Sequence, residues 1–142
     1  MTDVTSSPAR VEALRRVPLF AGIAEPSLER LATIVTEVEV PAGHVLVERG
    51  TEGSGMFVLE EGTVAIELAD HTLERGPGEF FGELALLAEG IRRTARVRAV
   101  TSARCLAISR RDFSELLEAE PSVAVAMLPE LARRLADAST HL

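Results

Sequence analysis

Residues 36–108 form a series of short β-rich runs that are separated by glycines. The runs cover residues 36–40, 44–48, 56–60, 63–68, 72–75, 94–100 and 103–108. Such runs, bounded by turn residues, are typical of strands. Seven or eight short strands in a row favour a jelly roll or another compact barrel. We therefore expect a mainly β protein, with a β jelly-roll barrel in the middle of the chain.

Helical patterns flank the β-rich section. Pro8 suits the first position of a helix that ends near Arg16. A second helix is expected from Glu25, with an apolar stripe made of Leu28, Leu31, Ile34 and Val35. We expect a disordered tail at 1–7 and one domain at 8–142, with N-terminal helices at 8–35, a β-roll at 36–108 and C-terminal helices at 109–142.

Two further helices are expected after the last strand. Ser109 is a suitable N-cap for a helix that runs to about Glu118. A final helix from about Ser122 to Ala138 contains Pro129 in its middle. Proline removes one backbone hydrogen bond, so we expect it to kink or break this helix and to separate a packed portion from a lid.

The net charge and the single cysteine indicate which kinds of partner the chain can bind and in which cellular compartment it is expected. The net charge of −7 argues against a chain built to bind nucleic acid or an anionic membrane. No stretch approaches the ~20 apolar residues of a membrane span, and the N-terminus lacks the apolar run of a signal peptide. One cysteine, Cys105, allows no internal disulfide. We expect a soluble, cytoplasmic protein without membrane contact.

The stretch 80–95 has the composition of an anion site. Gly82 allows a sharp turn before a short helix, whose first N–H groups favour an anion. Arg93 lies ten residues after Glu83 and could bind the same anion through its paired donors. A carboxylate would repel a bare phosphate, so Glu83 fits better as the acceptor of a neighbouring hydroxyl, as in dinucleotide sites. An anion beside a hydroxyl indicates a nucleotide.

Strand parity assigns the arginines near this stretch to opposite faces. Ala95, Val97 and Ala99 share one face of the strand, whereas Arg96 and Arg98 share the other. The same parity places Arg93 on the inward side. We interpret Arg96 and Arg98 as surface charges.

The stretch also resembles the phosphate-binding cassette of the cyclic nucleotide-binding domain family. That family includes kinase regulatory subunits, cyclic-nucleotide-gated channels and catabolite-activator-type regulators. The resemblance rests on Phe-Gly-Glu-Leu-Ala-Leu-Leu at 81–87 and Arg-Thr-Ala at 93–95. Further matches to the family precede the cassette. In chain order they are Val17-Pro18-Leu19-Phe20, Val40-Pro41-Ala42-Gly43, Gly50, Met56-Phe57, Glu61-Gly62 and Gly76-Pro77-Gly78.

The resemblance implies a role for each cassette residue. Glu83 would bind the ribose 2′-hydroxyl and Arg93 the exocyclic phosphate oxygens, while nearby backbone N–H groups complete the anion cradle. The alternative is a structural ion pair between Glu83 and Arg93. Arg92 is expected to be solvated, because the Arg-Thr-Ala context selects Arg93 in this longer loop. The expected ligand-binding residues are Gly82, Glu83, Leu84, Ala85, Arg93, Thr94 and Ala95.

The base pocket and its lid also come from the resemblance. Ile66 and Leu73 match apolar positions that pack against the base, and their alternative role is plain core packing. Arg133 or Arg134 in the last helix could stack on the purine, or could simply place favourable charge at a helix C-terminus. In the family, nucleotide binding moves this helix over the cassette. Thr94 does not separate cyclic AMP from cyclic GMP.

The remaining chemistry-bearing residues point to no enzyme and to no catalytic cofactor. The three histidines, His44, His71 and His141, lack metal-ligand spacing, which also argues against a cupin enzyme. Cys105 is expected to be buried and inert. Ser54 lies between two glycines, which is typical of a turn rather than of a nucleophile.

The resulting hypothesis is a non-enzymatic sensory domain that binds a cyclic nucleotide, with cyclic AMP favoured over cyclic GMP. One alternative is the effector part of a DNA-binding regulator, although this acidic chain alone is not expected to bind nucleic acid. Another is a degenerate jelly-roll module that binds partners but no nucleotide. Expected partners are the cyclic nucleotide, an unidentified effector protein or domain, and a second copy through the C-terminal helix.

Overall fold

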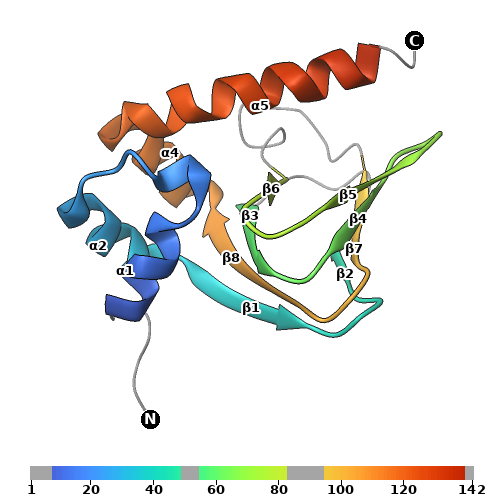
Figure 1. Ribbon diagram of the computed structural model, residues 1–142, viewed down its shortest axis with the longest axis horizontal. Helices are drawn as coiled ribbons and strands as arrows, with labels where there is room; N and C mark the ends of the chain where they lie inside the picture. The colour runs from blue at the N-terminus through green and yellow to red at the C-terminus, as the bar shows by residue number, and fades with distance from the viewer. Residues whose placement is uncertain (1–7, 49–54, 83–94, 140–142) are drawn as a thin grey trace. The chain divides into compact units, whose positions relative to one another are not determined.

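The computed structural model of the chain describes residues 8–48, 55–82 and 95–139, except for the side chains of residues 135 and 137–139 (Figure 1). The expectations for the tail at 1–7, for Ser54 and for His141 lie outside these residues, as does most of the expected cassette. The chain divides into two compact units. A helical unit comprises Met1–Thr33 and Ser114–Leu142, and a β unit comprises Ile34–Phe113.

The β unit contains two four-stranded antiparallel sheets. Its strands are β1 (Thr36–Val40), β2 (Val45–Val47), β3 (Gly55–Glu61), β4 (Val64–Glu67), β5 (Thr72–Arg75), β6 (Phe80–Phe81), β7 (Arg96–Ala99) and β8 (Ala103–Ser109). One sheet has the order β1-β8-β3-β6 and the other β2-β7-β4-β5. The mainly β jelly-roll class is confirmed, but the described strands form two sheets rather than a closed barrel (Figure 1).

The core of the β unit is built from alternating side chains of both sheets. Its buried members are Val40, Val47, Leu59, Val64, Phe81, Val97, Ala99, Ala103 and Cys105. The alternation of inward and outward side chains expected over residues 95–99 is confirmed. Ala95, Val97 and Ala99 are buried, while Arg96 and Arg98 are exposed. Burial of these apolar side chains is the main driving force for pairing the strands in this register.

The helical unit contains α1 (Pro8–Arg15), a 3-10 turn η1 (Pro18–Phe20) and most of α2 (Glu25–Ile34). The stripe expected on α2 is wrong at one position, because Ile34 is 36% exposed whereas Ala32 is buried. Leu28, Leu31 and Ala32 follow the spacing i, i+3, i+4, which is that of one helix face. Val35, just after the helix, is also buried. Ile34 lies well away from that face.

The C-terminal helices are α4 (Arg110–Ala119) and α5 (Pro121–Ser139). The expected N-cap is confirmed, since the Asp112 backbone N–H donates to the Ser109 hydroxyl oxygen at 3.1 Å. The expected break at Pro129 is wrong, because α5 continues through it. Proline removes its own hydrogen bond and displaces the carbonyl of Val125, and Val125 is 64% exposed to solvent. Solvent can therefore satisfy that carbonyl.

Candidate ligand site

The entry to the expected cassette is held by β6 and the turn before it. The Phe57 and Phe81 rings stack across β3 and β6, with centroids 5.2 Å apart. The Gly78 N–H donates to the Leu59 carbonyl at 2.7 Å, and the Glu79 carboxylate accepts from the Gly76 N–H. These contacts fix the position from which the chain enters the cassette.

Gly82 has the backbone conformation that the sharp turn requires. Its φ is +86°, a value that side-chain-bearing residues rarely adopt. The expectation of a glycine turn at this position is confirmed. Of the other cassette residues, Glu83, Leu84, Ala85, Arg93 and Thr94 lie outside the described residues, as does Arg92.

The described chain resumes at the far end of the cassette with Ala95, which is buried. On the opposite face of β7, Arg96 Nε donates to Glu48 at 3.0 Å, and Arg98 forms an ion pair with Glu67. Both arginine side chains are about half exposed, so their interpretation as surface charges is confirmed. Exposed ion pairs of this kind contribute about 0–1 kcal/mol each to the free energy of unfolding.

The two residues expected to contact the base lie together in the sheet. Ile66 on β4 pairs directly with Leu73 on β5, and on its other side with Val97 on β7. Opposed residues of an antiparallel pair project from the same face. Ile66 packs against the core, and both Ile66 and Leu73 are only partly buried. They therefore form a continuous apolar row with an accessible edge.

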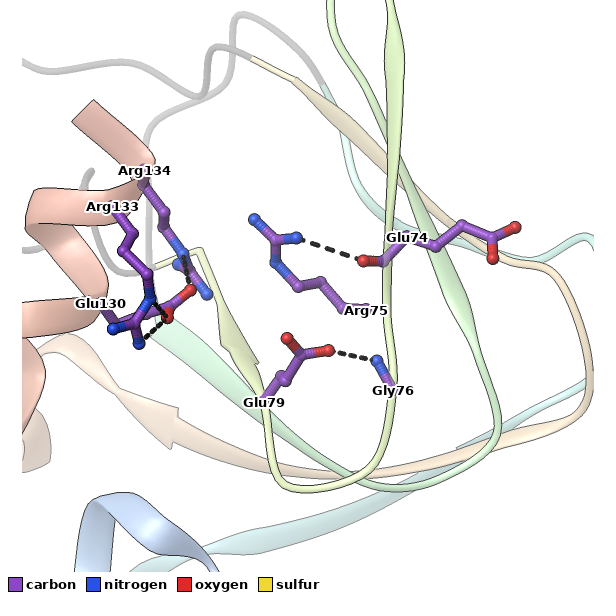
Figure 2. Close-up of polar contacts among 7 residues, drawn as sticks. All are labelled: Glu74, Arg75, Gly76, Glu79, Glu130, Arg133 and Arg134. Atoms are coloured by element: carbon purple, nitrogen blue, oxygen red, sulfur yellow. Dashed lines mark hydrogen bonds and ion pairs between the residues drawn. The ribbon is translucent and has the colours of Figure 1, made fainter. Parts of the chain in front are cut away.

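Arg133 and Arg134 share one carboxylate on α5. Arg133 Nη2 lies 2.6 Å from Glu130 Oε2, and Arg134 Nε lies 3.1 Å from Glu130 Oε1 (Figure 2). Burial alone would raise the pKa of Glu130, but the hydrogen bonds and charges of the two arginines lower it overall. The two side chains differ in exposure, at 68% for Arg133 and 15% for Arg134.

One arginine that the sequence interpretation missed lies on the same face as the apolar row. Arg75 pairs with Val64 in the register in which Leu73 pairs with Ile66, so its side chain projects from the inner face of β5. Figure 2 shows its guanidinium and the Glu74 carboxylate on opposite sides of the strand. The two-residue spacing of Leu73 and Arg75 is the signal that could have found it, because residues at that spacing in a strand share a face.

The described residues also test the expectations for Cys105 and for a metal site. Cys105 is fully buried, as expected, and burial, helped by the charge of Glu60, raises the pKa of its thiol to about 11. Within the same residues, no group of three His, Cys, Asp or Glu side chains is placed to hold a metal ion. None of the described helices combines the length and the apolar content that crossing a bilayer requires.

Comparison with known proteins identifies one family. The model of the cyclic nucleotide-binding domain matches residues 37–120, which is more than half of the chain. A cyclic nucleotide-gated potassium channel of Rhizobium etli is 37% identical over 108 residues, covering 76% of this chain and 30% of the channel. The chain spans less than a third of the length of the curated relatives that it matches first.

Solved structures agree with this match. The N-terminal domain of a transcriptional regulator from Streptomyces coelicolor A3(2) is 33% identical, with a TM-score of 0.67 over 89% of this chain and 94% of that domain. The cAMP-bound PfPKA-R has a TM-score of 0.81 over 93% of this chain and 46% of that one. At 20% identity, this second likeness is one of fold.

Proposed function

The chain belongs to the cyclic nucleotide-binding domain family, and from this we propose that it is a non-enzymatic sensor of a cyclic nucleotide. Cyclic AMP is the ligand that this proposal favours. Cyclic GMP is the second candidate. The observation that carries the proposal is the family match across the two sheets, with Gly82 in the required turn conformation at the start of the cassette.

We assign the cassette roles as part of this proposal. Arg93 binds the exocyclic phosphate and Glu83 the ribose 2′-hydroxyl, with backbone N–H groups of both cassette ends completing the cradle. The described ends are compatible with these roles, because Gly82 turns the chain at one end and Ala95 anchors it in the core at the other. Ile66 and Leu73 then offer their exposed apolar edge to the base.

The lid role of Arg133 and Arg134 is a further part of the proposal. Both guanidinium groups already donate their N–H edges to Glu130. Stacking on a purine uses the flat face of a guanidinium rather than its edge, so the ion pairs and the stacking are compatible. Of the two, Arg134 has the less exposed side chain, which makes it the better candidate.

A calorimetric titration with cyclic AMP and cyclic GMP tests ligand binding. At about 100 times its dissociation constant, a bound ligand stabilises the fold by ~2.7 kcal/mol, which a thermal shift would also report. Failure of both nucleotides to bind would favour the degenerate jelly-roll module instead.

Two neighbouring arginines provide a matched pair of variants for the phosphate contact. Arg93→Ala is expected to weaken binding by roughly 2–5 kcal/mol, because a buried phosphate charge loses its partner. Arg92→Ala serves as the control and is expected to have little effect. The opposite result would show that the two arginines have been assigned to the wrong roles.

A second candidate function is the effector part of a larger transcriptional regulator. The similarity to the regulator domain from Streptomyces coelicolor, of which the chain covers 94%, favours this alternative. In this alternative the chain binds the same cyclic nucleotide, and the binding regulates transcription. A DNA-binding assay on this chain alone is expected to be negative, since the net charge is −7.

Helix α5 offers a surface for a second copy or for an effector protein. Val125 and Leu128 are 64% and 61% exposed and lie three residues apart, on neighbouring positions of the helix surface. Light scattering on the purified chain, with Leu128→Asp as the variant, would separate a homodimer from a monomer. A monomeric wild type would leave an effector protein as the expected partner.

A further inference from the structure

Arg75 is a charged side chain on the apolar inner face of a sheet. It occupies the last position of β5, which is an outer strand of the order β2-β7-β4-β5. Its direct partner in β4 is Val64, which is fully buried in the core. A guanidinium is an unfavourable side chain for such a position, because its removal from water must be offset by hydrogen bonds or by ion pairs.

Those compensating contacts are incomplete. Arg75 Nη1 donates to the Glu74 carbonyl oxygen at 3.2 Å. Among the described residues, the buried Nε–H has no acceptor and the guanidinium forms no ion pair. A buried donor without a partner destabilises a fold by about as much as a lost hydrogen bond. Such an atom is therefore a place where a bound molecule can supply the missing acceptor.

The sheet register shows which part of a nucleotide could do so. Leu73 and Ile66 form one inner-face row, and Arg75 and Val64 form the next row along the strands. That second row continues to Ala99 on β7, four residues from Ala95 at the cassette end. At ~3.3 Å per residue, Arg75 lies about 13 Å along the strands from Ala95, with the row of Leu73 and Ile66 in between.

We propose that Arg75 is a base-contacting residue, which donates its Nε–H and a terminal N–H to acceptor atoms on the edge of a bound purine. This inference depends on the proposed function, because it assumes that the base lies on the row of Ile66 and Leu73. A phosphate at the Ala95 end is too far away for this side chain. A purine presents ring-nitrogen acceptors along its edges, and the planar guanidinium fork matches such acceptors well.

The variant Arg75→Met tests the contact, with Arg98→Met as the matched control. Methionine keeps an unbranched stem on the inner face and removes the donors. We expect Arg75→Met to weaken cyclic nucleotide binding about ten-fold or more, as the loss of a hydrogen bond to a charged group does. Arg98 lies on the outer face of β7, and its replacement should leave binding unchanged.

The melting temperature without ligand separates a ligand role from a structural one. Because the Nε–H has no acceptor in the described structure, Arg75→Met should melt at the same temperature as the wild type or at a higher one. A clear drop in melting temperature without ligand would show that Arg75 supports the fold, and would overturn the proposal.

Analogues of cyclic AMP in which N1, N3 or N7 is replaced by C–H locate the acceptor. If Arg75 donates to one of these atoms, the corresponding analogue should bind the wild type about ten-fold more weakly but bind Arg75→Met no more weakly than cyclic AMP does. Additive losses with all three analogues would overturn the base contact. If the wild type binds no cyclic nucleotide at all, the proposed function fails first, and the two failures are thereby distinguished.

Discussion

At the scale of single residues, Gly62 is a position where a larger side chain would meet both backbone strain and a steric clash. It forms the turn between β3 and β4 with φ of +91°. A Cβ atom there would overlap the Ser102 carbonyl oxygen and lie 2.9 Å from the Ala103 Cα atom. Both neighbours are backbone atoms, so neither can move aside by changing a side-chain rotamer.

We therefore expect Gly62→Ala to lower the free energy of unfolding by roughly 2–4 kcal/mol, from backbone strain plus overpacking. Gly43→Ala is the matched control, because Gly43 has φ of +90° but a Cβ atom added there would meet nothing within 4 Å. It should lose only about 1–2 kcal/mol. Urea denaturation of the two variants measures the difference. Equal losses of unfolding free energy would show that the close contact with Ser102 does not destabilise Gly62→Ala.

At the scale of elements, Glu130 pairs with two arginines along α5, and we expect these pairs to depend on pH. The pKa of its carboxyl is lowered from 4.5 in the folded chain. The stabilisation by its ion pairs is therefore complete above about pH 4.5 and is lost as the pH falls through the lowered pKa. We expect the free energy of unfolding to fall more between pH 6 and pH 3 in the wild type than in Glu130→Gln.

The difference between the two proteins should stay below about 1 kcal/mol, because pairs at i, i+3 and i, i+4 on a helix surface are weak. Denaturant titrations at several pH values measure it. The two proteins share all other carboxyl groups, so the comparison isolates Glu130. Parallel pH profiles would show that these ion pairs do not stabilise the folded chain.

The strands could be predicted from the sequence more accurately than the details of the helices. Glycine turns and alternating side chains defined β1 and β5 to the residue, because both signals are local. The continuation of α5 through Pro129 is explained by the solvent exposure of Val125, four residues earlier. The exposure of Ile34 is explained by its angle around the whole of α2. Neither can be derived from a proline or from an apolar residue considered alone.

The candidate site was predictable only in part, for a related reason. Motif spacing predicted the turn at Gly82, whereas the direct pairing of Ile66 with Leu73 is seen only in the structure. Arg75 was missed because a lone arginine in a short strand is usually solvated. Its proposed role rests on the register with Val64 and on a buried donor that has no acceptor among the described residues, and both are tertiary facts.

At the scale of the whole molecule, trypsin provides a test of the lid role proposed for Arg133 and Arg134 on α5. The chain contains no lysine, and the only arginines after Arg111 are Arg133 and Arg134. Cleavage at either of these two therefore removes a short C-terminal peptide and nothing else. If ligand binding repositions α5, a saturating cyclic nucleotide should slow this cleavage by a larger factor than it slows cleavage at Arg16.

Arg16 is the internal control, because it is exposed just after α1 and has no role in the proposed site. A ligand that only stabilises the folded chain lowers the population of globally opened molecules, by about 100-fold at 100 times its dissociation constant. Cleavage that requires global opening would then slow by the same factor at Arg16 as at Arg133 and Arg134. A constant ratio of the two rates, measured by mass spectrometry across a titration, would exclude ligand-driven movement of α5, whereas a selective loss of cleavage at Arg133 and Arg134 is the result that we expect.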